Sequence, residues 1–320
     1  MKLAQYYSFL HQDINIIEEE LQQAISSSSQ TLNEASLHLL QAGGKRIRPV
    51  FVLLGGKFGE YNIDVVKNVA VSLELIHMAS LVLDDVIDDA EIRRGIPTVK
   101  SQWDNKVAMY TGDYIFARSL DYMLNIPNPE AHKILSDAIV EVCKGEIAQI
   151  KDKYLFEQSL RDYLRRIKRK TALLIAVSCQ LGAIVSGAPR EVHERLYRFG
   201  YYVGMSFQII DDILDFTATA DELGKPAGGD LLQGNITLPV LFAMEDPILR
   251  QQITLVHENI SSDELQTIIV NVKNSDAIER SHQVSQQYLK KAIQELRHLP
   301  KNKAKSTLRD IATYLGKRKY

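Results

Sequence analysis

This chain of 320 residues has only two cysteines and a net charge close to zero, and its apolar runs are short. The two cysteines, Cys143 and Cys179, are too few and too scattered for a disulfide scaffold or a zinc site, and we expect both to be small buried side chains in a reducing compartment. A formal net charge of −2 argues against nucleic acid as the main partner. No stretch approaches the roughly 18 consecutive apolar residues of a membrane-spanning helix, and the first residues lack the apolar core of a secretion signal. These absences predict a soluble, cytoplasmic protein.

Helical periodicity runs through most of the chain, and a hydrophobic content of 45% is sufficient for a full core. The spacing predicts helices over residues 3–24, 31–42, 64–89, 106–124, 130–150, 159–186 and 189–217, with four or five more after residue 237. No alternation typical of a strand is convincing, and no change in composition marks a boundary. We therefore predict an all-α fold in a single domain, residues 1–320. The long irregular segment 218–235 is interpreted as a lid, since loops of that length in compact domains usually serve function.

Two acidic clusters stand in similar apolar, helix-forming surroundings, LVLDDVIDDAEIRRG and FQIIDDILDF. Both follow the pattern Asp-Asp-x-x-Asp, and they consist of Asp84, Asp85 and Asp88, and of Asp211, Asp212 and Asp215. Carboxylates four residues apart share one helix face, and such charges among apolar residues are costly when bare. A hard divalent cation removes that cost; Mg²⁺ in particular is usually completed by a substrate phosphate. One such cluster also fits a solvated helix end, but the repeat predicts two walls of one magnesium site.

Basic residues accompany both clusters, as a diphosphate would require. Arg93 and Arg94 follow the first cluster, and Lys225 follows the second within a glycine-rich segment. In GGKRIRP, the glycines allow the backbone to approach an anion, while Lys45 and Arg48 supply charge. Taken alone, this motif also fits a helix stop with solvated charges.

Four further residues accompany the clusters, and two of them, His77 and Gln208, share a helix face with one. His77 lies two helical turns before Asp84 on the same face, where a lone histidine is more often a hydrogen-bonded core residue than a ligand. The pair Lys170-Thr171 ends the basic run RRIKRKT, and Gln208 precedes Asp211 by one turn.

Together these motifs resemble the trans-type polyprenyl diphosphate synthases. GGKRIRP, LVLDDVIDDAEIRRG, the Lys170-Thr171 pair, FQIIDDILDF and GKPAGGDLLQGNITLP fall in that family's order and spacing, from about residue 42 to the C-terminus. The resemblance implies a helical bundle of the isoprenoid synthase type with a central active-site cavity. It also implies a magnesium-dependent prenyltransferase that condenses an allylic diphosphate, such as farnesyl diphosphate, with successive isopentenyl diphosphates into a long all-trans chain.

The resemblance also assigns residues, position by position. Three Mg²⁺ ions would be held by Asp84, Asp88 and Asp211. Asp85, Asp212 and Asp215 would either bind the ions directly or support the residues that do. The allylic diphosphate would be held by Arg93, Lys170, Thr171, Gln208 and Lys225. Isopentenyl diphosphate would be held by Lys45, Arg48, His77 and Arg94. One departure concerns Asn235, where many relatives carry a lysine, so one phosphate contact is expected to be weaker or supplied by Lys225 alone.

Product length is expected to depend on Ala79 and Ser80, which precede Asp84 by about 7.5 and 6 Å along the helix at roughly 1.5 Å per residue. Short-chain relatives place aromatic residues here, so two small residues predict an open shaft for the growing chain. The alternative interpretation is that small residues at these positions only allow neighbouring helices to pack closely.

The stretches GGDLLQGNITLPVLFAM and IATYLGKRKY carry a finer likeness, to the catalytic subunits of two-component enzymes of menaquinone side-chain synthesis. That likeness implies a heptaprenyl product and a non-identical small subunit in a heterodimer.

Three alternatives stay open at this point. A self-sufficient homodimeric synthase would make a hexa- to decaprenyl chain. A terpene cyclase shares the fold but usually carries an Asn/Ser/Glu-type second motif, unlike Asp211-Asp212-x-x-Asp215. A non-catalytic prenyl-diphosphate carrier or regulatory subunit is disfavoured by the intact acid clusters.

Overall fold

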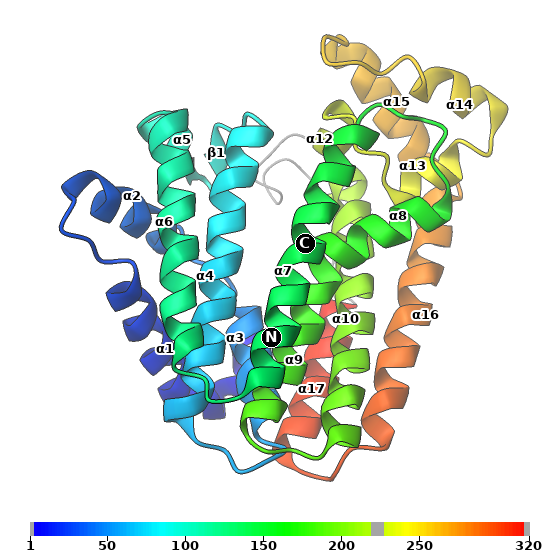
Figure 1. The fold of residues 1–320 in the computed structure, drawn as a ribbon. Helices are drawn as coiled ribbons and strands as arrows, with labels where there is room; N and C mark the ends of the chain where they lie inside the picture. Colours follow the sequence, from blue (N-terminus) through cyan, green and yellow to red (C-terminus); the bar gives the residue numbers. More distant parts are fainter. Residues whose placement is uncertain (1–2, 219–226, 317–320) are drawn as a thin grey trace. The chain divides into compact units, whose positions relative to one another are not determined.

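The computed structural model describes residues 3–218 and 227–316, most of them in helices, which confirms the all-α class (Figure 1). Lys225 and the rest of 219–226, in the predicted lid, lie outside the described residues. Contacts divide the chain into two compact units, which we treat separately. The first unit is Met1–Leu135, Val177–Tyr197 and Leu299–Leu308, and the second is Ser136–Ala176, Arg198–His298 and Arg309–Tyr320. The assignment of the chain to one domain stays a prediction.

The first unit is built around α4, a long and largely buried helix. Its elements up to residue 124 are η1 (Leu3–Leu10), α1 (His11–Ala24), α2 (Gln30–Gln41), α3 (Ile47–Gly56), α4 (Ile63–Ile87), β1 (Ile92–Arg93), β2 (Ile96–Pro97), α5 (Val99–Gln102) and α6 (Asn105–Leu124). Figure 1 shows α6 alongside α4, and Gly112 permits this contact because a Cβ there would lie 2.9 Å from Leu83 Cδ2. Ser72 Oγ adds a hydrogen bond to the carbonyl oxygen of Ser119 at 3.1 Å. The helix that carries the first acidic cluster is thereby fixed.

A small hairpin follows α4, where the sequence suggested no strand. Ile92 pairs with Pro97 and Arg93 with Ile96. The two turn residues, Arg94 and Gly95, have φ values of 53° and 82°, as expected for the tight hairpin turn whose central residues are both left-handed. Strands of two residues are too short to show an alternation of polar and apolar residues in the sequence, which explains why this hairpin was not predicted.

The remaining elements include those of the second unit. They are α7 (Pro129–Asp152), α8 (Leu160–Ile167), η2 (Lys168–Ala172), α9 (Leu173–Val185), α10 (Arg190–Thr217), α12 (Gly229–Leu232), α13 (Leu238–Ala243), α14 (Pro247–Ile253), α15 (Ser262–Asn274), α16 (Ala277–Arg297) and α17 (Lys303–Leu315). One apolar cluster of this unit gathers residues of α8, α10 and α16, and another gathers residues of α12 to α15. The short helix α12 lies inside the segment that was expected to be irregular.

The single helix predicted over 159–186 is interrupted by one π-helical turn, η2. The last residue of this turn packs closely against α10. A Cβ on Gly204 of α10 would lie only 2.5 Å from Ala172 Cα, so the two backbones meet at a distance that only glycine permits. A π-turn inserts an extra residue and changes the direction of the side chains around it, and such turns are frequent at functional sites.

The cysteines are only partly as expected. Cys179 is buried, but Cys143 is exposed on α7, which corrects its assignment to the core. Among the helices of the described ranges, none combines the length and the apolar character needed to cross a bilayer.

Candidate active site

The first acidic cluster lies at the C-terminal end of α4. Asp84 and Asp85 are in the last turn, and Asp88 follows the helix, its N–H donating to the carbonyl oxygen of Asp84 at 2.8 Å. The side chains of Asp84 and Asp88 are half-buried. A helix C-terminus already carries unpaired carbonyls and the negative end of the dipole, so carboxylates here concentrate negative charge. This end of the helix therefore favours a cation.

Asp85 is held by an arginine that the hairpin brings back toward α4. Arg93 Nε and Nη2 lie 2.7 and 2.6 Å from Asp85 Oδ1. Burial raises the pKa of Asp85, and the Arg93 guanidinium opposes that rise. Asp85 is 2% exposed, and its Oδ1 accepts a hydrogen bond from this guanidinium. The pairing favours a role for Asp85 behind the metal ligands, with Arg93 as the group that it orients.

Motifs far apart in the sequence meet at Gly44. A Cβ on this residue would lie 2.9 Å from Arg94 Nη1 and 3.1 Å from Arg46 Nη1. The glycine loop of GGKRIRP thus lies directly against the arginine that follows the first acidic cluster. This contact brings together two parts of the predicted isopentenyl diphosphate site.

Arg46 is a structural part of this region that the sequence did not single out. It has a left-handed φ of 47° at the N-terminus of α3 and is 9% exposed. Its Nε donates to Glu18 Oε1 at 2.6 Å and its Nη1 donates to Glu74 Oε1 at 3.1 Å. Arg46 therefore anchors the loop that carries Lys45 and Arg48 to both α1 and α4.

Positive charge exceeds negative charge around His77. Burial, followed by the charges of Arg48 and Arg94, lowers the pKa of His77 well below its ordinary value, so its imidazole is neutral. Burial also lowers the pKa of Arg48, an effect that Glu74 opposes. Arg48 Nε is buried with no hydrogen-bond partner among the described residues. An anion such as isopentenyl diphosphate would supply the acceptor that this nitrogen lacks.

In the second unit the three acidic residues of α10 differ in exposure. Asp211 is exposed, whereas Asp212 and Asp215 are 3% and 2% exposed. Asp212 Oδ1 accepts from Gln208 Nε2 at 2.8 Å and Oδ2 accepts from the Tyr163 hydroxyl at 2.7 Å. Burial, supported by the charge of Asp230, raises the pKa of Asp212 to about 8. The protein itself occupies both oxygens of Asp212, which favours a supporting role.

Asp215 connects the end of α10 to the start of α12. Its carbonyl oxygen accepts from the Gly228 N–H at 2.7 Å, and its Oδ2 accepts from the Asp230 N–H at 3.1 Å. The Asn235 N–H in turn donates to the carbonyl oxygen of Asp230 at 2.8 Å. Because backbone groups hold Asn235 in place, the position tolerates a side chain other than lysine without loss of this local structure.

The π-turn η2 carries the pair Lys170-Thr171. Lys170 Nζ donates to Gln149 Oε1 at 2.9 Å, and Thr171 Oγ1 donates to Gln208 Oε1 at 2.5 Å. Thr171, Gln208 and Asp212 thus form one hydrogen-bonded group.

The predicted site residues that the structure describes are divided between the two units. The first unit contains Asp84, Asp85, Asp88, Arg93, Arg94, Lys45, Arg48 and His77, and the second contains Lys170, Thr171, Gln208, Asp211, Asp212 and Asp215. In the described ranges, no three acidic, histidine or cysteine side chains are arranged to hold a metal ion alone. The donor set still fits Mg²⁺, since this ion takes one or two carboxylates and completes its shell with water and substrate phosphate.

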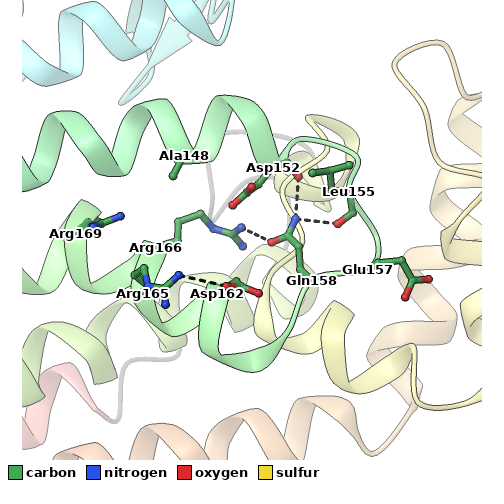
Figure 2. A pocket seen from close by; sticks show the side chains of 9 residues that line it. All are labelled: Ala148, Asp152, Leu155, Glu157, Gln158, Asp162, Arg165, Arg166 and Arg169. Atoms are coloured by element: carbon green, nitrogen blue, oxygen red, sulfur yellow. Dashed lines mark hydrogen bonds and ion pairs between the residues drawn. The ribbon is translucent and has the colours of Figure 1, made fainter.

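A separate pocket of about 380 Å³ lies in the second unit (Figure 2). Its lining is Ala148, Asp152, Leu155, Glu157, Gln158, Asp162, Arg165, Arg166 and Arg169. None of these is a predicted site residue, and the three acidic and three basic side chains balance one another. Arg166 Nη1 donates to Gln158 Oε1 at 2.6 Å in its wall. The pocket therefore has no marked preference for a diphosphate.

Comparison with known proteins gives a consistent result. The family model for polyprenyl synthetases matches residues 29–274. The chain is 64% identical to heptaprenyl diphosphate synthase component 2 of Bacillus subtilis, over 100% of this chain and 92% of that protein. It resembles the crystal structure of heptaprenyl diphosphate synthase from Staphylococcus aureus, with a TM-score of 0.94, 42% identity and coverage of 97% and 99% of the two chains. A polyprenyl synthase from Caulobacter crescentus, solved with calcium and isoprenyl diphosphate, has a TM-score of 0.95, 26% identity and coverage of 100% and 98%.

Proposed function

The chain belongs to the polyprenyl synthetase family of Mg²⁺-using prenyltransferases, and we propose that it is the catalytic subunit of a two-component heptaprenyl diphosphate synthase. Its substrates would be an allylic primer, farnesyl diphosphate, and successive isopentenyl diphosphates, and its product would serve menaquinone side-chain synthesis. The observation that carries this proposal is the 64% identity, over the full chain, to a relative named component 2 of such an enzyme.

The two diphosphates would bind to different residue groups. The excess of positive charge around Arg48 and His77, with Lys45 and Arg94 beside it, suits isopentenyl diphosphate. The allylic diphosphate would meet Arg93, Lys170, Thr171, Gln208 and Lys225. This division would let one substrate ionise while the other stays intact.

Metal binding would fall to Asp84, Asp88 and Asp211, and we propose three Mg²⁺ ions, with Asp85, Asp212 and Asp215 in support. Bound Mg²⁺ would offset the negative charge that builds up on the departing diphosphate. The limited exposure of Asp85 and Asp212, and the protein donors on their oxygens, support their placement behind the ligands.

The reaction would begin when the allylic carbon–oxygen bond breaks and its electron pair leaves with the diphosphate. The double bond of isopentenyl diphosphate then attacks the allylic cation and forms the new carbon–carbon bond. A proton leaves the resulting cation for the released diphosphate, which accounts for the lack of an obvious general base in the sequence. The basic residues stabilise the leaving group electrostatically, and apolar helix walls keep water from the cation.

The test is an incubation of the purified chain with farnesyl diphosphate, isopentenyl diphosphate and Mg²⁺. We expect little elongation by the chain alone and heptaprenyl diphosphate once its non-identical subunit is added from an extract of the source organism. Robust long-chain synthesis by the pure chain would favour the homodimeric alternative. Binding of prenyl diphosphates without condensation, even with the extract, would favour a carrier.

A further inference from the structure

Tyr163 on α8, which the sequence did not identify, contacts the second acidic cluster through Asp212. Its side chain is fully buried, and its hydroxyl donates to Asp212 Oδ2 at 2.7 Å. The bonds continue through Gln208 Nε2, 2.8 Å from Asp212 Oδ1, to Thr171 Oγ1, 2.5 Å from Gln208 Oε1. All four residues belong to the second unit.

The direction of these hydrogen bonds follows from the groups involved. Asp212 accepts at both oxygens, so Gln208 must turn its amide N–H toward it. The Gln208 carbonyl oxygen is then the group that faces Thr171, and Thr171 donates its single hydroxyl proton to it. The second N–H of the Gln208 amide then remains to donate to an acceptor such as a phosphate oxygen. An anchor on Asp212 therefore sets the orientation of the Gln208 amide and the position of Thr171 beside it.

Tyr163 is itself held firmly. Its helix begins with a capping box in which Ser159 and Asp162 bond to each other's backbone N–H. One turn after Tyr163, Arg166 donates to Gln158 Oε1 at 2.6 Å (Figure 2). Arg166 also donates to the carbonyl oxygen of Ile236. The Tyr163 ring belongs to the apolar cluster of α8, α10 and α16. The hydroxyl thus has a fixed position from which to orient Asp212.

We propose that Tyr163 is a positioning residue for the allylic diphosphate: its hydroxyl fixes Asp212, and through Gln208 it fixes Thr171. This inference rests on the proposed function of Thr171 and Gln208. It adds a residue that makes no contact with substrate and that no motif contains.

The test compares Tyr163→Phe with Tyr288→Phe in the enzyme assembled with its second subunit. Tyr288 packs against the same apolar cluster and makes a hydrogen bond with Tyr201, so its variant also removes one hydroxyl there. Tyr163→Phe should raise the KM for the allylic substrate about tenfold and leave the KM for isopentenyl diphosphate unchanged, since one hydrogen bond to a buried carboxyl is lost. Tyr288→Phe should change neither. Equal changes in both KM values, or no change, would overturn the proposal.

A second comparison separates positioning from a general structural effect. If Tyr163 acts through Thr171, then Tyr163→Phe should add little to the loss already caused by Thr171→Val, because coupled residues are not additive. Additive losses would contradict the proposal. Should Tyr163→Phe fold poorly, Tyr163→Met takes its place, since it also removes the hydroxyl and fills the buried site with a flexible apolar side chain, and the same rise in allylic KM is expected. A wild-type enzyme unable to condense the substrates would refute the proposed function instead.

Discussion

Chain length offers a demanding test, because the structure distinguishes the two small residues that precede Asp84. Ala79 is 2% exposed, and its carbonyl oxygen lies 3.5 Å from the place that a Cβ on Gly112 would take, so α6 lies against it. Ser80 is half-buried, and its Oγ donates to the carbonyl oxygen of His77 at 2.8 Å. A ring at the buried Ala79 must therefore displace neighbouring groups, whereas a ring at the half-buried Ser80 replaces a hydroxyl bonded within its own helix.

The magnitudes favour Ser80→Phe as the cleaner variant. Overpacking at Ala79 by Tyr should cost about 1–3 kcal/mol of folding free energy. Loss of the Ser80 hydroxyl should cost less, since the His77 carbonyl also lies within a helix. Each isoprene unit of a growing chain gains about 4 kcal/mol on burial, at about 0.8 kcal/mol for each of its five carbons, but only where space is open. A ring that fills the space removes that gain for every later unit.

The assay is chromatography of the products made by the assembled enzyme, with circular dichroism as the check on folding. We expect Ser80→Phe and Ala79→Tyr to shift the products toward geranylgeranyl diphosphate or shorter chains, because the acidic cluster still ionises the primer. Ser80→Ala, which removes the hydroxyl without adding a ring, should give the normal product. Full-length product from folded Ser80→Phe would show that the chain does not grow past these residues.

Two further outcomes are expected. Asp84→Ala should lower turnover by about 100- to 1,000-fold with the fold intact, as measured by steady-state rates, because one electrostatic contact to the departing diphosphate is lost; near-normal turnover would remove Asp84 from the metal site. Gly204→Ala should lower the melting temperature and raise the KM for the allylic substrate, because its Cβ would lie 2.5 Å from Ala172 Cα and would push η2 from α10; an unchanged KM would mean that this close approach does not set the position of Thr171.

The helices were predictable where local signals decide them. The long helix expected over 64–89 is α4, Ile63–Ile87, and the one expected over 189–217 is α10, Arg190–Thr217. Asn62 caps α4 through its side chain, and Pro189 precedes the first residue of α10. The π-turn at Lys168–Ala172 was not predicted, since no local signal marks it, and its close contact with Gly204 joins residues far apart in the sequence.

The residues of the candidate site also differ in whether the sequence alone indicates them. Asp84, Asp88 and Asp211 could be proposed from the sequence because a repeated acidic pattern within apolar, helix-forming segments is unusual and points to a ligand. Arg46 and Tyr163 could not be found, because each is common in its local setting and gains its role from partners 28 and 49 positions away. Groups that would meet the substrate are conspicuous in a sequence because alone they are unstable in their surroundings. Groups that hold them are satisfied within the fold, so only the structure reveals them. Variants of such residues therefore test the packing around the site more directly than variants of the acidic clusters.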